Sequence, residues 1–194
     1  MRKMKTIILA SASPRRKEIL EKTGLKFKVD ESDYEENMDI SLQPCELAKR
    51  HSIGKAKAVA ARYRNALIIS ADTIVVLKNR VLGKPCNRKE AKGMLKALSG
   101  MTHTVITGYT ILDTESGKET TKSVESKVFF KRLTDDEINT YIKSGEPLDK
   151  AGAYGVQGLG ALIVKKIEGD FFNVMGLPLS ALAESLKKFG IRVL

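Results

Sequence analysis

Residues 67–77 form the most hydrophobic stretch of the chain, and apolar side chains follow one another there almost without interruption. Such a run is typical of a central strand that is covered on both faces, so it predicts a sheet flanked by helices. The stretch contains one charged residue, Asp72. Because burial of an unpaired carboxylate is costly, Asp72 either is satisfied by backbone N–H groups or serves as a metal ligand or general base.

A strand, a tight turn and a helix are predicted near the start of the chain. Residues 7–9 are a short apolar run of the kind that a buried strand uses. Ser13 then provides an N-cap residue, and Pro14 stands at the first helical position, where its missing N–H has no cost. The helix is therefore expected to begin at residue 14.

The first turn of this helix is basic. Arg15, Arg16 and Lys17 lie where the helix dipole favours carboxylates rather than cations. A bound anion would offset their charge, because free N–H groups, the hydroxyls of Ser11 and Ser13, and guanidinium groups all bind oxyanions. A phosphate chain is the obvious candidate ligand, and a solvated basic turn is the alternative.

The overall charge points in the same direction. Lys and Arg together number 34 against 23 Asp and Glu, which gives a net charge of +11. Such an excess favours polyanionic partners, whether nucleotides, nucleic acid or a membrane surface. No apolar run approaches the roughly 18 residues that a membrane-spanning helix needs. Two cysteines without a CxxC pair are typical of a reduced cytoplasmic protein without a zinc site, and two histidines are too few for a His-rich metal site.

An acidic stretch interrupts this basic chain. Six carboxylates fall within residues 30–39, the last of them Asp39. The stretch is either a solubilising loop or a source of ligands for a hard cation.

The remaining pattern alternates helices and strands. Strands are expected over residues 25–29, 67–77, 81–85, 102–112, 119–130 and 161–167, with a possible edge strand at 192–194. Helices are expected over residues 44–64, 87–98 and 134–145, and within 173–189. Asn87 is the expected N-cap of the second of these helices, and Thr134 with Glu137 forms an expected capping box at the third.

Residues 146–160 are a candidate binding loop. Four glycines fall within nine residues there, interspersed with polar side chains that include Tyr154 and Gln157. Glycine lets backbone N–H groups approach a ligand closely. His103, at the start of an expected strand, is either structural or catalytic.

Several short motifs, in this order, closely resemble those of the Maf family of nucleoside triphosphate pyrophosphatases. They are Leu9-Ala10-Ser11-Ala12-Ser13-Pro14-Arg15-Arg16, Ala71-Asp72-Thr73, Gly83-Lys84-Pro85, Leu98-Ser99-Gly100 with His103, the run from Asp149 to Gly158, and Asn173 to Pro178. The resemblance covers the whole chain and implies one Maf-like domain over residues 1–194. It also implies a mixed α/β fold with two lobes around a cleft, similar to inosine triphosphate pyrophosphatases.

The resemblance implies cleavage of a nucleoside triphosphate to the monophosphate and pyrophosphate with a divalent cation, Mg²⁺ or Mn²⁺. The positions that match the family's phosphate-binding residues are Arg15, Arg16, Lys55 and Lys84. Ser11 and Ser13 are expected to join them.

Asp72 matches the family's proton acceptor and is expected to take a proton from the attacking water while the cation neutralises developing charge. Asp72 and either Glu35 or Glu36 are the expected metal ligands, since both glutamates stand where the family has a single acid.

Base preference is expected to depend on Arg15, Thr73 and Gln157, which match the branch of the family that prefers dTTP and UTP. CTP and modified pyrimidine nucleotides are further candidate substrates. The Gln157 amide offers both a donor and an acceptor to a pyrimidine edge. A homodimer is a further implication of the family.

Three other classes of function stay open on the sequence. A nucleic-acid-binding protein fits the net charge, although helix-turn-helix, zinc and RNP signatures are missing and the bases are scattered rather than striped. A metal-dependent phosphatase would release orthophosphate instead of pyrophosphate. A regulatory protein of cell division would keep the nucleotide site for sensing alone.

Overall fold

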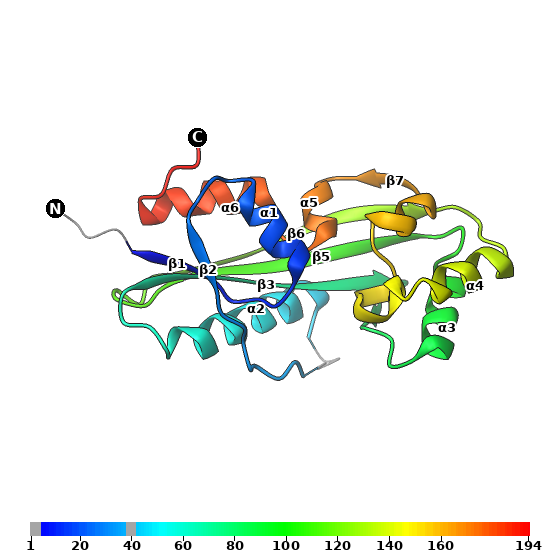
Figure 1. The fold of residues 1–194 in the computed structure, drawn as a ribbon, viewed down its shortest axis with the longest axis horizontal. Helices are drawn as coiled ribbons and strands as arrows, with labels where there is room; N and C mark the ends of the chain where they lie inside the picture. Colours follow the sequence, from blue (N-terminus) through cyan, green and yellow to red (C-terminus); the bar gives the residue numbers. More distant parts are fainter. Residues whose placement is uncertain (1–4, 38–41) are drawn as a thin grey trace. The chain divides into compact units, whose positions relative to one another are not determined.

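The computed structural model describes residues 5–37 and 42–194 (Figure 1). Asp39, in the acidic stretch, lies outside the described residues. The chain divides into two compact units. The first contains the described residues up to Asp72 together with Thr107–Val124 and Gly176–Leu194, and the second contains Thr73–Ile106 and Glu125–Met175. We treat each unit separately.

Seven strands form one mixed sheet in the order β2-β1-β3-β5-β6-β7, with β4 paired to β3. The strands are β1 (Thr6–Leu9), β2 (Phe27–Val29), β3 (Ala66–Leu77), β4 (Arg80–Leu82), β5 (Thr102–Asp113), β6 (Glu119–Phe130) and β7 (Val164–Glu168). β1 pairs in parallel with both β2 and β3, whereas β4 and β7 are antiparallel to their neighbours. The expected mixed α/β architecture is confirmed.

The helices begin and end close to their expected positions. They are α1 (Pro14–Glu21), α2 (Pro44–Ala60), α3 (Arg88–Leu98), α4 (Asp135–Lys143), α5 (Phe171–Met175) and α6 (Leu179–Leu186), with short 3₁₀ helices η1 (Glu146–Asp149), η2 (Ala151–Ala153), η3 (Gly158–Leu162) and η4 (Lys187–Phe189). Asn87 accepts a hydrogen bond from the Glu90 N–H, and Thr134 with Glu137 forms the capping box. None of the helices in the described part of the chain combines the length and the apolar character needed to cross a membrane.

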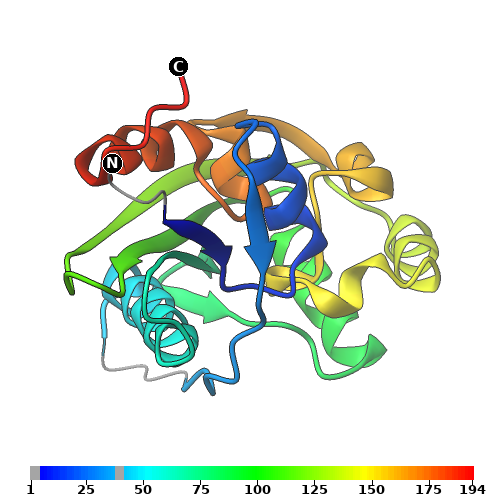
Figure 2. The same cartoon turned by 60° about the vertical axis from the view of Figure 1, so that its left-hand side comes forward.

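Helices cover both faces of the first unit's strands, which explains the apolar run in β3. Figures 1 and 2 show α2 on one side of β1 and β3, and α1 with α6 on the other. Neighbouring residues of β5 record the two contacts, because alternate residues of a strand face opposite ways. A Cβ on Gly108 would overlap the backbone of Ala48 in α2. The Tyr109 hydroxyl, on the other face, donates to the Ala181 carbonyl in α6 over 2.8 Å.

Two details of the expected secondary structure are wrong. The strand expected from residue 161 begins only at Val164, because residues 158–162 form η3. The possible edge strand at residues 192–194 does not form. There Gly190 takes a φ of 78° and the Ile191 N–H donates to the Leu186 carbonyl, which caps the end of the last helix instead of extending the sheet.

In the second unit, the glycine-rich segment is fastened to the sheet by its aromatic residue. Tyr154 is buried against His103 of β5 and Phe130 of β6, with ring centroids 4.7 to 5.2 Å apart in edge-to-face contacts. The Tyr154 hydroxyl lies 2.6 Å from His103 Nε2. Of the two interpretations of His103, these contacts support the structural one.

Burial lowers the pKa of His103 to about 4. The side chain is 3% exposed, and its Nδ1 has no hydrogen-bond partner among the described residues. The folded protein therefore holds a neutral imidazole over a range in which an unfolded chain, with a pKa near 6.5, binds a proton.

We predict that His103 makes the protein less stable as the pH falls. Above pH 6.5 the imidazole is neutral in both states, and from pH 6.5 to 4 only the unfolded state gains a proton, so its contribution to the free energy of unfolding falls by about 3 kcal/mol. His103→Gln removes the titration and keeps a polar atom for Tyr154. Urea denaturation of both proteins across this range should show their stability difference changing with pH, and a constant difference would contradict the prediction.

Candidate active site

Asp72 lies in β3 with its side chain almost completely buried, at 4% exposure. Its Oδ1 is 2.5 Å from Lys55 Nζ, and its Oδ2 is 3.1 Å from His51 Nδ1. His51 and Lys55 are four residues apart on α2, so they lie on the same face of that helix. Asp72 is therefore paired with two side chains of α2 and does not depend on backbone N–H groups alone.

Glu36 brings a second carboxylate to this cluster. Its Oε1 is 2.6 Å from Lys55 Nζ, so the lysine lies between two acids. One ligand atom from each of Glu36, His51 and Asp72 lies within 4.8 Å of the others. Glu35 is exposed and is not part of this group.

The rest of the acidic stretch has a structural role. Arg62 Nη1 donates to Asp30 Oδ1 over 2.8 Å, and its Nη2 is 3.3 Å from Asp33 Oδ1. The Tyr63 hydroxyl donates to the other oxygen of Asp30 over 2.9 Å. The acidic stretch is thus tied to the end of α2, and this contact places Glu36 beside Lys55.

The basic first turn of α1 is also held in place. Arg16 Nε donates to the Gly176 carbonyl over 2.9 Å, and Arg16 Nη1 is 3.4 Å from Ser11 Oγ. Ser11 Oγ also accepts a hydrogen bond from the Ser13 N–H over 3.2 Å. Ser13 is the N-cap residue as expected, although its hydroxyl makes no capping hydrogen bond. Arg15, next to Arg16, is partly buried.

Opposing effects act on the Asp72 carboxyl. Burial raises the pKa of Asp72, but the hydrogen bond from His51 and the positive charges of Lys55 and Arg16 outweigh it and hold that pKa well below its usual range. The hydrogen bond to Asp72 in turn raises the pKa of His51, against the effect of burial. Asp72 is therefore an ionised carboxylate at neutral pH, fit to accept a proton or to bind a cation.

Three of the expected site residues belong to the second unit. Thr73 follows Asp72 on β3 and is partly buried, and Lys84 is exposed after β4. Gln157 is the partly buried N-cap residue of η3. Ser11, Ser13, Arg15, Arg16, Glu36, Lys55 and Asp72 belong to the first unit.

Sequence reasoning missed His51. The two histidines were considered only as too few for a His-rich site, which left a single buried histidine beside a carboxylate unexamined. The available signal was its position one helical turn before Lys55 on an expected helix, because a lysine and a histidine so spaced reach the same partner.

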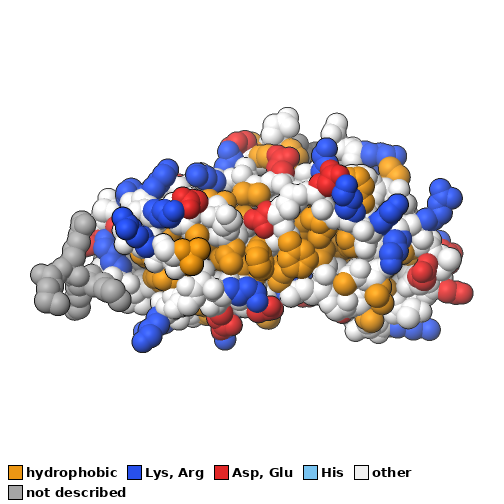
Figure 3. Space-filling view, turned by 90° about the horizontal axis from the view of Figure 1, so that it is seen from above, with side chains coloured by type: hydrophobic (Ala, Val, Ile, Leu, Met, Phe, Trp, Pro, Cys, Tyr) orange, Lys and Arg blue, Asp and Glu red, His pale blue; other side chains and the backbone are white. Residues whose placement is uncertain are grey.

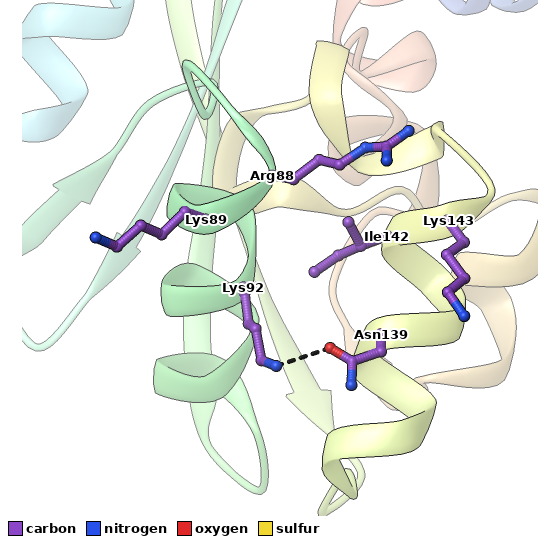
Figure 4. A pocket seen from close by; sticks show the side chains of 6 residues that line it. All are labelled: Arg88, Lys89, Lys92, Asn139, Ile142 and Lys143. Atoms are coloured by element: carbon purple, nitrogen blue, oxygen red, sulfur yellow. Dashed lines mark hydrogen bonds between the residues drawn. The ribbon is translucent and has the colours of Figure 1, made fainter.

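A second basic cavity lies between α3 and α4, with a volume of about 400 Å³ (Figure 4). It is lined by Arg88, Lys89, Lys92, Asn139, Ile142 and Lys143, and Lys92 Nζ donates to Asn139 Oδ1 over 2.8 Å. No carboxylate lines it, so it offers neither a general base nor oxygen ligands for a cation. None of the expected site residues lines this cavity.

The fold and the cluster around Asp72 define a class of protein: a mixed α/β protein with an ionised buried carboxylate among cationic side chains, suited to an anionic substrate. The family model for Maf-like proteins matches residues 6–189, so the chain belongs to the Maf family. Relatives named dTTP/UTP pyrophosphatase come from Methanosarcina barkeri (strain Fusaro / DSM 804), with 50% identity over 98% of this chain and 97% of the relative, and from Pelotomaculum thermopropionicum (strain DSM 13744 / JCM 10971 / SI), with 48% identity over 98% and 100%. A third relative of that name, from Thermoanaerobacter sp. (strain X514), has 51% identity over 97% of this chain and 99% of its own length.

Gly54 gives a prediction about how the acidic stretch rests on α2. A Cβ at residue 54 would overlap the ring of Tyr34, whereas a Cβ at Gly93 of α3 would meet no atom within 4 Å. Alanine in a helix interior is ordinarily favoured over glycine by about 0.5–1 kcal/mol. Gly93→Ala should show that gain, while Gly54→Ala should lose about 1–3 kcal/mol, because the Tyr34 ring has to move.

Urea denaturation of the two variants and of Tyr34→Ala/Gly54→Ala checks this prediction. The double variant should show a smaller penalty at residue 54 than the single variant does, because the overlapping ring is gone. Equal stabilisation by Gly54→Ala and Gly93→Ala would contradict the packing of Tyr34 on α2.

Proposed function

We propose that this protein hydrolyses nucleoside triphosphates to the monophosphate and pyrophosphate, with preference for dTTP and UTP. The observation that carries the proposal is Lys55 Nζ between Asp72 and Glu36, at 2.5 and 2.6 Å, beside the basic first turn of α1. A cationic group and an ionised base are thereby provided for one anionic substrate. The names of the relatives support the same reaction and the same substrates.

The donor set of the cluster fits a divalent cation. Asp72 and Glu36 would hold it, since Mg²⁺ and Mn²⁺ prefer carboxylate oxygens, and Glu36 rather than exposed Glu35 is the second ligand that the cluster favours. When bound, the cation neutralises charge on the phosphate oxygens.

The protein's own residues then have separate tasks. In our proposal Asp72 takes a proton from water, the water oxygen bonds to phosphorus, and the bond from phosphorus to the leaving pyrophosphate oxygen breaks. Arg15, Arg16, Lys55 and Lys84 bind the phosphates, with Ser11 and Ser13 near the turn. A phosphate that draws Lys55 away from Asp72 would also make that carboxylate a better base, because a neighbouring positive charge lowers its proton affinity.

Base preference stays a proposal about Arg15, Thr73 and Gln157. The Gln157 amide has a donor and an acceptor for the edge of a pyrimidine, and a base that leaves one of them unpaired should be rejected. CTP and modified pyrimidine nucleotides present related edges and belong in the same test. Dimerisation stays a prediction that a sedimentation experiment can test.

No specific observation favours a nucleic-acid-binding role. On the face shown in Figure 3, Lys and Arg side chains are interspersed with acidic and hydrophobic ones and do not form a stripe. The alternative of an orthophosphate-releasing phosphatase, like a purely regulatory role, is separated from our proposal by the products.

The test is a panel of nucleoside triphosphates incubated with the protein and Mg²⁺ or Mn²⁺ at neutral pH, with products separated by chromatography. We expect dTTP and UTP to give monophosphate and pyrophosphate faster than the purine triphosphates do. Release of orthophosphate would indicate the phosphatase. Absence of cleavage for every triphosphate would overturn the proposal.

Lys55 offers a sharper prediction with a matched control on the same helix. Lys55 has 11% side-chain exposure and contacts two carboxylates, whereas Lys57, two residues later, is exposed. Because a hydrogen bond to a charged group is worth about 1.5–3 kcal/mol, Lys55→Met should lower kcat/KM about 10- to 100-fold. Lys57→Met should leave it unchanged. Steady-state kinetics on the best substrate check this, and equal effects of the two substitutions would contradict the role of Lys55.

A further inference from the structure

His51 connects two parts of the candidate active site that come from different segments of the chain. Its ring is buried, with 1% exposure. Nδ1 lies 3.1 Å from Asp72 Oδ2 in β3, and Nε2 lies 2.9 Å from the backbone carbonyl of Asn37. Asn37 directly follows Glu36, so one imidazole spans the distance between the two carboxylates.

Both partners of the ring accept hydrogen bonds. A backbone carbonyl offers only lone pairs, and so does an ionised carboxylate. Each ring nitrogen therefore donates an N–H in this arrangement, and neither has a lone pair left for a cation. This distinguishes His51 from Asp72 and Glu36, whose oxygens are the ligands that a hard cation prefers.

The contact also divides the work of the two Asp72 oxygens. His51 occupies Oδ2, while Oδ1 faces Lys55. A carboxylate held at one oxygen cannot rotate freely, so Oδ1 is directed to the side where Lys55 and Glu36 lie. The remaining charged group acting on Asp72 is Arg16, which is fastened to the Gly176 carbonyl.

We propose that His51 is a positioning residue for the reaction: it fixes the orientation of Asp72 and holds the segment that carries Glu36 against it. The proposal rests on the function proposed above. It assigns the proton-accepting role to Asp72 Oδ1, and it excludes His51 from direct binding of the cation. Residues that orient a reactive or metal-binding group typically contribute 10- to 100-fold to activity or metal affinity.

The two hydrogen bonds can be separated by substitution. In His51→Asn the amide nitrogen takes the place of Nδ1 and can donate to Asp72, but it does not reach Asn37. In His51→Gln the amide nitrogen takes the place of Nε2 and can donate to the Asn37 carbonyl, but not to Asp72. His51→Leu keeps the volume of the side chain and makes neither bond.

Kinetics provide the first readout. We expect His51→Leu and His51→Gln to lose about 10- to 100-fold in kcat with KM within about threefold of wild type, while His51→Asn stays within about fivefold in kcat. Wild-type kcat in His51→Leu, or equal losses in His51→Asn and His51→Leu, would overturn the positioning of Asp72. Recovery of His51→Leu by excess Mg²⁺ or Mn²⁺ would overturn it too, because that result indicates a metal ligand.

Hydrogen exchange provides a second readout that does not depend on activity. Amides of residues 30–37 should exchange faster in His51→Leu and His51→Asn, which lack the bond to Asn37, and should stay near wild type in His51→Gln. Uniform exchange in all four proteins would overturn the link to the Glu36 segment. If the wild type cleaves no triphosphate while the exchange pattern is as expected, the proposed function fails and the link made by His51 stands.

Discussion

The ion pair between Asp72 and Lys55 is the interaction on which the rest of the site depends. A carboxylate in a strand covered on both faces would ordinarily be too costly to keep ionised. Here a lysine, a histidine and a nearby arginine lower its pKa more than burial raises it. The same fold that buries the chemistry of Asp72 therefore keeps that chemistry charged.

Helix α2 supplies most of what this arrangement needs. His51 and Lys55 reach Asp72 from one face of the helix, Gly54 leaves room for the Tyr34 ring, and Arg62 just after the helix binds the acidic stretch. A mid-helix glycine ordinarily weakens a helix. In this protein it allows the segment with Glu36 to lie against α2, so local helix stability is reduced where the site gains a close contact.

Much of the fold follows from patterns that are local in the sequence. Alternating and continuous apolar runs predicted β3, β5 and β6 nearly to the residue, and the capping residues Asn87 and Thr134 marked the starts of α3 and α4. The start of β7 was misplaced, because the 3₁₀ turns of η3 carry no periodic signal that sequence patterns reveal.

The site was predictable where a residue was chemically unusual for its surroundings. Asp72 stood out as the one charge in an apolar strand, and the basic first turn of α1 as the wrong sign for a helix N-terminus. The choice between Glu35 and Glu36 needed the path of the acidic stretch over α2, which depends on contacts between residues far apart in the sequence. His51 was missed for the same reason, since nothing local distinguishes it from a histidine of the core.

The most direct test of the account is single-turnover hydrolysis of dTTP or UTP by Asp72→Asn, with nucleotide binding measured on the same samples. Asp113→Asn is the matched control, because Asp113 is another buried aspartate of the first unit and is paired with Lys5 over 2.6 Å. We predict that Asp72→Asn binds nucleotide and reacts about 10²- to 10⁴-fold more slowly, while Asp113→Asn reacts at the wild-type rate. Wild-type turnover by Asp72→Asn would contradict the central claim and make Asp72 a structural residue.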